Sequence, residues 1–221
     1  ISMQNKLWAE SGRRMVTITD PHIKVDPRYH VYAEGKAGHH FVQKHGRDFE
    51  GHCWPGKSVW IDFLKPAARK WYSSLFAFDK YQGSTEHLFS WIDMNEPSVF
   101  SEGQYKMPYD ARHDGNVRHH QAANLYGYYQ SVAAYHGLAE RSKWTARPFV
   151  LTRSFFAGSQ RYAAMWTGDN QAKFSHLAGS VEMVLSLSLC GMPFSGADVG
   201  GFFDNPDPHL LARWYQLGAV Y

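Results

Sequence analysis

The chain has 221 residues, of which 44% are hydrophobic and 19% charged, a balance that excludes a disordered chain, a collagen and a coiled coil. Its net charge is only +3, and its Lys and Arg residues are scattered, which argues against binding to nucleic acid or to an anionic membrane. Its two cysteines, Cys53 and Cys190, are too few for a disulfide framework.

The first half of the chain predicts two strands and a helix, with a long insertion between them. Residues 15–19 form a short β-rich run. The stretch 24–63 is too long for an ordinary connection, and we expect a loop that serves a site. Pro66 can open a helix, and residues 87–95 read as the second strand. The residues expected on the apolar face of that helix are Trp71, Leu75 and Phe78.

The second half continues the alternation of helices and short strands. Helical spacing begins at Ala122, although Gly127 weakens it, and returns at 172–189. Asp207 and Pro208 read as the N-cap and first residue of a last helix. The β-rich runs in this half are residues 148–155, 161–169 and 192–198. Buried strands that alternate with helices predict an α/β fold with a parallel sheet, either doubly wound or a (β/α) barrel.

Each predicted strand is followed by an ionisable or amide side chain. In chain order these are Asp20, then Asp93 with Asn95 and Glu96, then Arg153, then Asp169 with Asn170, then Asp198. The carboxyl ends of parallel strands lie on one side of the sheet, where active sites are built. We therefore expect several carboxylates and one guanidinium around a common mouth.

Two carboxylates in such a mouth can serve as the nucleophile and the general acid/base of glycoside hydrolysis. Trp91 lies two residues before Asp93, and Trp166 lies three residues before Asp169. Indole rings can stack on a sugar and exclude water, and aromatic residues make up 16% of the chain.

A metal site and a phosphate-binding loop are both disfavoured by the sequence. The histidine pairs His39-His40 and His119-His120, and His22 after Asp20, have no metal-ligand spacing on an evident helix. The glycines around Asp198 match neither a dinucleotide nor a P-loop pattern. We expect no metal and no cofactor.

Three segments together resemble glycoside hydrolase family 31. They are WIDMNEPSVF at Trp91–Phe100, RPFVLTRSFFAGSQRYAAMWTGDN at Arg147–Asn170 and GADVGGF at Gly196–Phe202. The resemblance implies a (β/α)8 TIM barrel, of which residues 1–221 would be the central part, about strands 3 to 7, with the insertion at 24–63. A partial barrel is expected to be inactive and poorly folded alone, because its two edge strands are unpaired.

The resemblance also assigns roles to residues that match the family motifs. Asp93 becomes the catalytic nucleophile, Asp169 the general acid/base, and Arg153 the arginine that binds sugar hydroxyls. The expected walls of the same subsite are Trp54, Trp91, Met94, Trp166 and Phe202, with Asp20 and Asp198 as further substrate-binding acids.

By resemblance the function is that of a retaining α-glucosidase that removes terminal α-linked glucose. The segments DPHIKVD at Asp20–Asp26 and EGHCWPG at Glu50–Gly56 fit members that trim α-1,3-linked glucose from N-glycans in the endoplasmic reticulum lumen. The implied partners are an oligosaccharide or N-glycan substrate and a regulatory β subunit. The alternatives are an α-xylosidase, a starch- or maltose-directed α-glucosidase, and a non-catalytic carbohydrate-binding relative.

Overall fold

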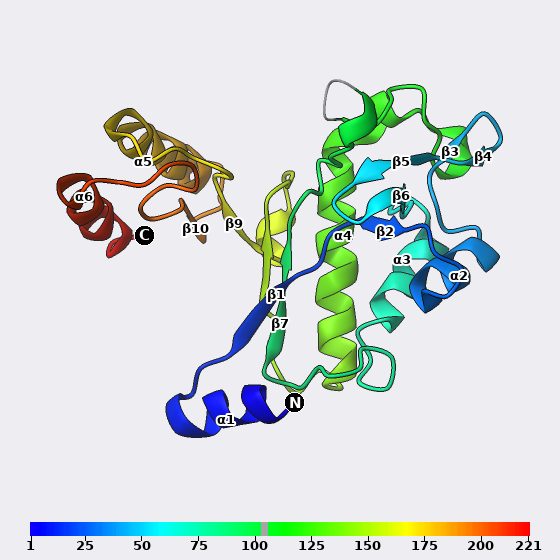
Figure 1. Cartoon of the computed structure of the whole chain (residues 1–221), viewed down its shortest axis with the longest axis horizontal. Coiled ribbons are helices and arrows are strands. Elements are labelled where there is room, and N and C mark those ends of the chain that lie inside the picture. The colour runs from blue at the N-terminus through cyan, green and yellow to red at the C-terminus, as the bar shows by residue number, and fades with distance from the viewer. Residues whose placement is uncertain (103–105) are drawn as a thin grey trace.

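The computed structural model describes residues 1–102 and 106–221, and a five-stranded parallel sheet runs through it (Figure 1). The strand order is β1-β7-β8-β9-β10, so each strand pairs with the next along the chain that belongs to this sheet. The strands are β1 (Met15–Ile18), β7 (Leu88–Ile92), β8 (Val150–Thr152), β9 (Ala164–Trp166) and β10 (Ser195–Gly196). All five lie within the predicted runs, and the α/β class with a parallel sheet is confirmed.

The helices that follow these strands are α4 (His119–Arg141), α5 (Phe174–Leu189) and α6 (Pro208–Gly218). Helix α4 begins earlier than the pattern from Ala122 indicated. The predicted cap of α6 is confirmed, because the Asp207 carboxylate accepts a hydrogen bond from the Leu210 amide at 2.8 Å. None of the described helices is both long and apolar enough to cross a membrane.

Helix α3 (Pro66–Ser74) begins at the predicted proline but is shorter than the pattern implied. Leu75 is its C-cap and Phe78 lies beyond it, 44% exposed, so the prediction that Phe78 lies on the helix face is wrong. The chain turns at this point through consecutive hydrogen bonds from the amides of residues 75–77 to carbonyls three residues earlier. Helical spacing of apolar residues therefore continued past the end of the helix.

The stretch 24–63 is not a loop, contrary to the expectation. It contains helix α2 (His30–Ala37), the small hairpin β3 (Gln43–Lys44) and β4 (Arg47–Asp48), and strands β5 (Glu50–Cys53) and β6 (Gly56–Trp60). With β2 (His22–Lys24), the last two form an antiparallel sheet of order β2-β6-β5. These strands are short and partly polar, so their sequence lacks a clear alternation, and pairing with buried Val59 and Trp60 in β6 stabilises them instead.

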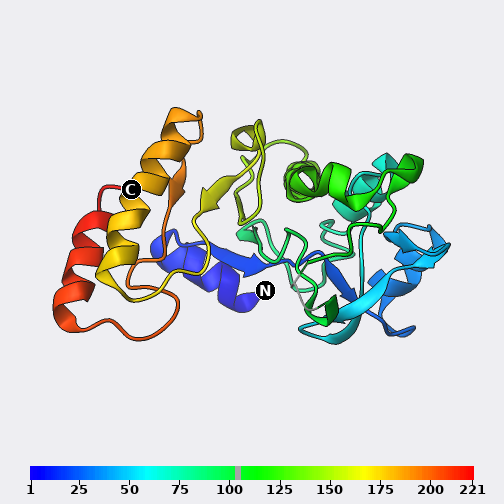
Figure 2. The same ribbon diagram turned by 90° about the horizontal axis from the view of Figure 1, so that it is seen from above.

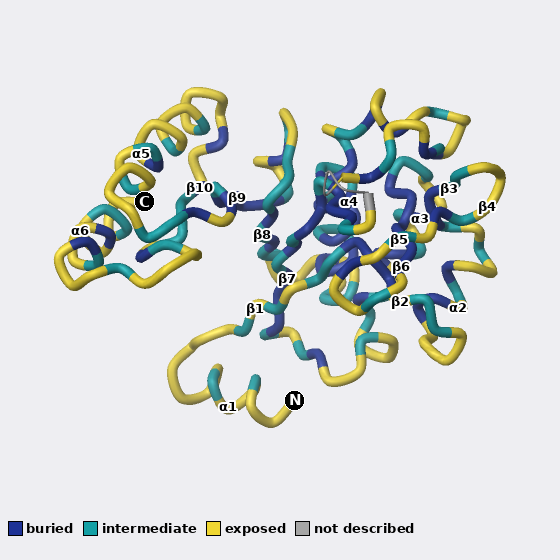
Figure 3. The backbone as a smooth tube through the Cα atoms, turned by 45° about the horizontal axis from the view of Figure 1, so that its top comes forward, coloured by how far each residue is buried: buried dark blue, intermediate teal, exposed yellow. Residues whose placement is uncertain are grey.

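The main hydrophobic core lies between this small sheet, α3, α4 and β7. Its largest fully buried side chains include Trp60, Phe41, Phe63 and Tyr126. In contrast, α5 buries only Ser180 among its side chains, and Figure 3 shows mostly exposed residues along α5 and α6. Seen from above, β10, α5 and α6 lie at one end of the molecule and the small sheet at the other (Figure 2).

Within the described residues the parallel sheet stays open. Strands β1 and β10 each have a single neighbour, and on the β1 edge Val16 and Ile18 are 42% and 52% exposed. The short N-terminal helix α1 (Ser2–Ser11) buries none of its residues. The carboxyl ends of the five strands nevertheless meet at one edge, which positions the site.

Candidate active site

The five predicted strand-end groups follow β1, β7, β8, β9 and β10 within three residues of each strand end. Because the strands are parallel and adjacent in that order, Asp20, Asp93, Arg153, Asp169 and Asp198 are carried to the same edge. Asp93 and Arg153 come directly after Ile92 and Thr152, the last residues of the paired strands β7 and β8. The sheet therefore places these two side chains next to each other.

Arg153 lies at the centre of this group. Its Nη1 atom is 2.8 Å from Asp93 Oδ1 and 3.6 Å from Asp169 Oδ1. Its Nε and Nη2 atoms donate to the two oxygens of Glu96 at 2.8 and 3.0 Å. Nη2 also lies 3.1 Å from the Met94 sulfur. Burial opposes the charge of Arg153, but the carboxylates of Glu96, Asp93 and Asp169 outweigh it and raise its pKa above the ordinary value.

The two carboxylates that share Nη1 are close together. The distance between their nearest oxygens cannot exceed the sum of the two contacts to this atom. That limit admits the ~5–5.5 Å between the carboxyl groups of retaining glycosidases. A pair of carboxylates at this separation can supply a nucleophile and a proton donor.

The pKa values of the site carboxylates are shifted in different directions. Desolvation raises the pKa of Asp93, although Arg153 and the Met94 amide partly oppose it. Desolvation also raises the pKa of Asp198, with the charges of Asp169 and Asp93 acting in the same direction. Burial alone would raise the pKa of Glu96, but hydrogen bonds from Arg153 and Ser98 lower it below the ordinary value. Of these three carboxylates, Glu96 is the one whose surroundings favour the ionised form.

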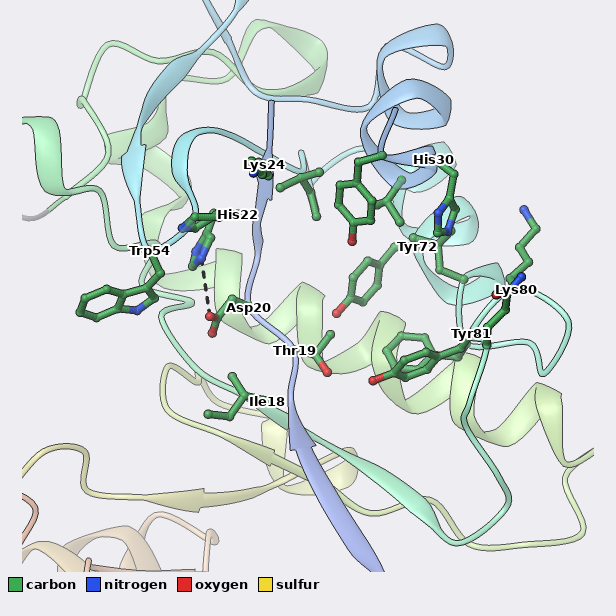
Figure 4. Close-up of a pocket in the computed structure, with 17 residues that line it drawn as sticks. Ile18, Thr19, Asp20, His22, Lys24, His30, Trp54, Tyr72, Lys80 and Tyr81 are labelled. Atoms are coloured by element: carbon green, nitrogen blue, oxygen red, sulfur yellow. Dashed lines mark ion pairs between the residues drawn. The ribbon is translucent and has the colours of Figure 1, made fainter. Parts of the chain in front are cut away.

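Asp20 lines a cavity of about 860 Å³ beside the small sheet (Figure 4). His22 is its neighbour, with Nε2 3.6 Å from Asp20 Oδ2. Desolvation by burial, followed by the charge of Asp93, raises the Asp20 pKa to about 7, and burial lowers the His22 pKa to about 4. Near neutral pH the histidine is therefore uncharged and the aspartate is only partly ionised. Asp20 Oδ1 and His22 Nδ1 are buried without a hydrogen-bond partner among the described residues.

The raised pKa of Asp20 predicts a pH-dependent contribution to stability. Between its unfolded value of 3.8 and its folded value of about 7, the native state holds a proton that the unfolded state has lost. The contribution is therefore present at low pH and is lost as the pH rises through 7. We expect Asp20→Asn to remove a stability difference of at least about tenfold in the unfolding equilibrium constant, ~1.4 kcal/mol, between pH 5 and pH 8.

Thermal unfolding of both proteins at these two pH values measures this effect. Only the difference between them isolates Asp20, because His22 and His119, with pKa values lowered by burial to about 4, act in the opposite direction below pH 6.5. Parallel stability profiles for wild type and variant would contradict the assignment.

The aromatic residues predicted as walls lie in three places. Trp91 and Trp166 pack edge to face at the ends of β7 and β9, 5.5 Å between ring centroids, and Trp166 is buried. Trp54 is at the tip of the β5–β6 hairpin, 69% exposed, and packs edge to face on Phe100. Trp54 also lines the cavity next to Asp20.

The last two predicted wall residues are tied to segments that carry the two acids. The Phe202 amide donates to the Asn170 side chain at 2.9 Å, which ties this half-exposed ring to the residue after Asp169. Met94 follows Asp93 with a left-handed φ of 58° and is 6% exposed. The sequence reasoning omitted Glu96 and Phe100 from the candidate site residues. A signal for Glu96 was present, because it directly follows the second strand, but its role depends on the side chain of Arg153.

Three of the histidines, His40, His113 and His119, make structural contacts. His113 bridges Asp62 and His119 in a buried chain, with contacts of 2.7 and 3.0 Å. His40 stacks on Trp71. In the part of the chain that the structure describes, no group of three or more His, Cys, Asp or Glu side chains is placed to hold a metal ion. Cys53 is buried and Cys190 exposed, and both are free.

Comparison with known proteins places these features in context. Residues 2–221 match the family model described as the TIM-barrel domain of glycosyl hydrolases family 31. A probable glucan 1,3-alpha-glucosidase of Oryza sativa subsp. japonica is 54% identical over 220 residues, which are 99% of this chain and 24% of the relative.

Solved structures agree with this comparison. The glucosidase II alpha subunit with bound Glc1Man2 superposes with a TM-score of 0.96 and 52% identity, over 100% of this chain and 24% of that chain. The same values apply to an ER glucosidase II heterodimeric complex of the catalytic subunit with the binding domain of the regulatory subunit. The chain thus spans about a quarter of the length of these relatives.

Proposed function

Because this chain belongs to glycosyl hydrolase family 31, we propose that the intact protein is a retaining α-glucosidase with Asp93 as nucleophile and Asp169 as general acid/base. The observation that carries the proposal is the single Arg153 nitrogen within reach of both carboxylates. In this proposal residues 1–221 form the central part of the barrel, about its third to seventh strands. Asp20, Asp198, Trp54, Trp91, Met94, Trp166 and Phe202 line the sugar subsite.

The reaction proceeds by two displacements at the anomeric carbon. Asp93 attacks this carbon, its bond to the leaving oxygen breaks, and Asp169 donates a proton to that oxygen. A β-glucosyl ester on Asp93 remains. Water then attacks the same carbon, Asp169 accepts its proton, and the Asp93 carboxylate leaves. Arg153 counteracts the burial of Asp93 and so favours its ionised form before attack, whereas the Asp169 side chain, 36% exposed, is more open to the leaving group and water.

The substrate in this proposal is α-1,3-linked glucose at the end of an N-glycan, and the site of action is the lumen of the endoplasmic reticulum, with a regulatory subunit as partner. Similarity to glucosidase II and to a probable glucan 1,3-alpha-glucosidase supports these finer assignments. Hydrolysis of nigerose, maltose and an α-xyloside by the intact protein tests the linkage and the sugar. Faster cleavage of maltose or of the xyloside would favour a starch-directed α-glucosidase or an α-xylosidase.

Trapping of the covalent intermediate tests the chemistry. We expect incubation with a mechanism-based fluoroglucoside to add one fluoroglucosyl group to Asp93, because the ring fluorine slows both displacements while an activated leaving group keeps formation of the ester faster than its hydrolysis. Mass spectrometry of the peptide that contains residues 91–100 measures the adduct. Absence of any adduct would favour the non-catalytic carbohydrate-binding alternative, and an adduct on another carboxylate would refute the assignment of Asp93.

A further inference from the structure

Arg153 is held at both its backbone and its side chain by two consecutive residues, Asn95 and Glu96. The fully buried Asn95 amide donates to Thr152 Oγ1 at 2.9 Å and accepts from the Ser154 amide at 2.8 Å. These are the residues on either side of Arg153. Glu96 receives the side chain, at Nε and Nη2. Asn95 and Glu96, which follow β7, thus fix both the backbone around Arg153 and its side chain.

The Glu96 carboxylate also accepts a hydrogen bond from a second partner besides Arg153. The Ser98 hydroxyl donates to Glu96 Oε2 at 2.6 Å. A bidentate pair between a carboxylate and the Nε–Nη2 edge of a guanidinium also sets the plane of the guanidinium. Only Nη1 is then left to face Asp93 and Asp169.

The contact between Asn95 and Ser154, next to Arg153, is closely packed against α4. Gly127 lies there, where a Cβ atom would come within 2.6 Å of the Ser154 carbonyl oxygen and 2.9 Å of the Asn95 amide nitrogen. This contact gives a reason for a glycine inside a helix, where it costs stability. The backbone that carries Arg153 therefore has little freedom to move, and the direction of its side chain depends on its partners.

Building on the proposed function, we propose that Glu96 is a positioning residue that competes with the nucleophile for Arg153. It occupies two donor atoms of the guanidinium and leaves Asp93 a single contact. Without Glu96, the guanidinium would be free to close on Asp93 with two parallel hydrogen bonds, the geometry that arginine and carboxylate prefer. Such a pair would cover the oxygen needed for attack on the sugar.

The charged groups that interact with Asp93 determine the sign of the expected change. They are Arg153 after β8, Asp169 after β9, Asp20 after β1, Asp198 after β10 and Glu96 on its own segment. In Glu96→Gln a negative charge that raises the Asp93 pKa is lost, and the positive charge of Arg153 is freed toward Asp93. Both changes lower the Asp93 pKa, so the acid limb of the pH profile moves to lower pH.

The test compares Glu96→Gln with wild type in the intact protein, and uses Glu140→Gln, an exposed glutamate on α4, as the matched control. We expect Glu96→Gln to lower kcat on the order of 10²-fold and to move the acid limb of kcat/KM down by about one pH unit, with Glu140→Gln unchanged. An acid limb that stays in place would overturn the proposal, and the position of the guanidinium in the variant separates repositioning of Arg153 from loss of the Glu96 charge alone.

A crystal structure of the Glu96→Gln variant tests the geometry without relying on turnover. We expect the guanidinium to be rotated onto Asp93, with two of its nitrogens within hydrogen-bond distance of that carboxylate. An unmoved Arg153 would overturn the positioning role. Wild-type protein without α-glucosidase activity would instead refute the proposed function, and the crystal structure would still decide the role of Glu96.

Discussion

Replacing Asp93 by Ala in the intact protein is expected to lower turnover of an aryl α-glucoside by at least about 10⁴-fold, equivalent to ~5.4 kcal/mol of activation free energy. Without this carboxylate no ester to the anomeric carbon can form, and the first displacement has no nucleophile. An activated leaving group cannot compensate for this loss, so the deficit should be similar for aryl glucosides of different leaving-group acidity.

The control for this variant is Asp79→Ala, which removes an exposed aspartate in the turn after α3 and should retain wild-type activity. Initial rates and the melting temperature of both variants separate lost chemistry from lost folding. Undiminished turnover by a folded Asp93→Ala protein would refute the assignment of Asp93 as the nucleophile.

Replacing Asp169 by Ala should give a loss that depends on the leaving group. A sugar alkoxide needs a proton to depart, so hydrolysis of nigerose should fall by about 10³–10⁴-fold. A dinitrophenyl group departs without a proton, so formation of its glucosyl-enzyme should be much less affected. The second displacement still lacks a base for water, and the intermediate should accumulate.

Azide provides the diagnostic measurement for Asp169. As an anion it needs no base, so it should restore turnover of the dinitrophenyl glucoside in Asp169→Ala and yield α-glucosyl azide, with the Asp93 carboxylate as leaving group. Asp93→Ala should show no such product by this route. Equal losses with both leaving groups and no effect of azide would show that another residue is the general acid/base.

The sequence was sufficient to predict the elements that build the site, for identifiable reasons. The central strands β7, β8 and β9 lie in short, largely apolar runs, as expected of strands in the middle of a parallel sheet, and a polar side chain follows each of them. Asp207 and Pro208 predicted the start of α6 correctly, since the N-cap bond is made within four residues. These signals are local, and the tertiary structure leaves them unchanged.

Predictions that depended on distant contacts were less successful. Residues 24–63 were expected to form a loop because the stretch is too long for an ordinary connection. Strands β5 and β6 within it are short and partly polar, and their stability comes from mutual pairing and from the core below them. Gly127 weakened the prediction of α4, yet the helix continues through it, and a larger residue at this position would collide with Asn95 and Ser154.

The same contrast between local sequence signals and tertiary contacts applies to the site itself. The order of acids and the arginine along the chain, together with a parallel topology, determined which side chains share the edge of the sheet. Only the tertiary structure decided that Arg153 binds Glu96 with two of its donor atoms and leaves one for Asp93 and Asp169. It likewise decided that Asp20, buried at the cavity, has a pKa of about 7. Hydrogen-bond geometry and desolvation depend on groups brought together from five strands, and no local pattern of residues encodes them.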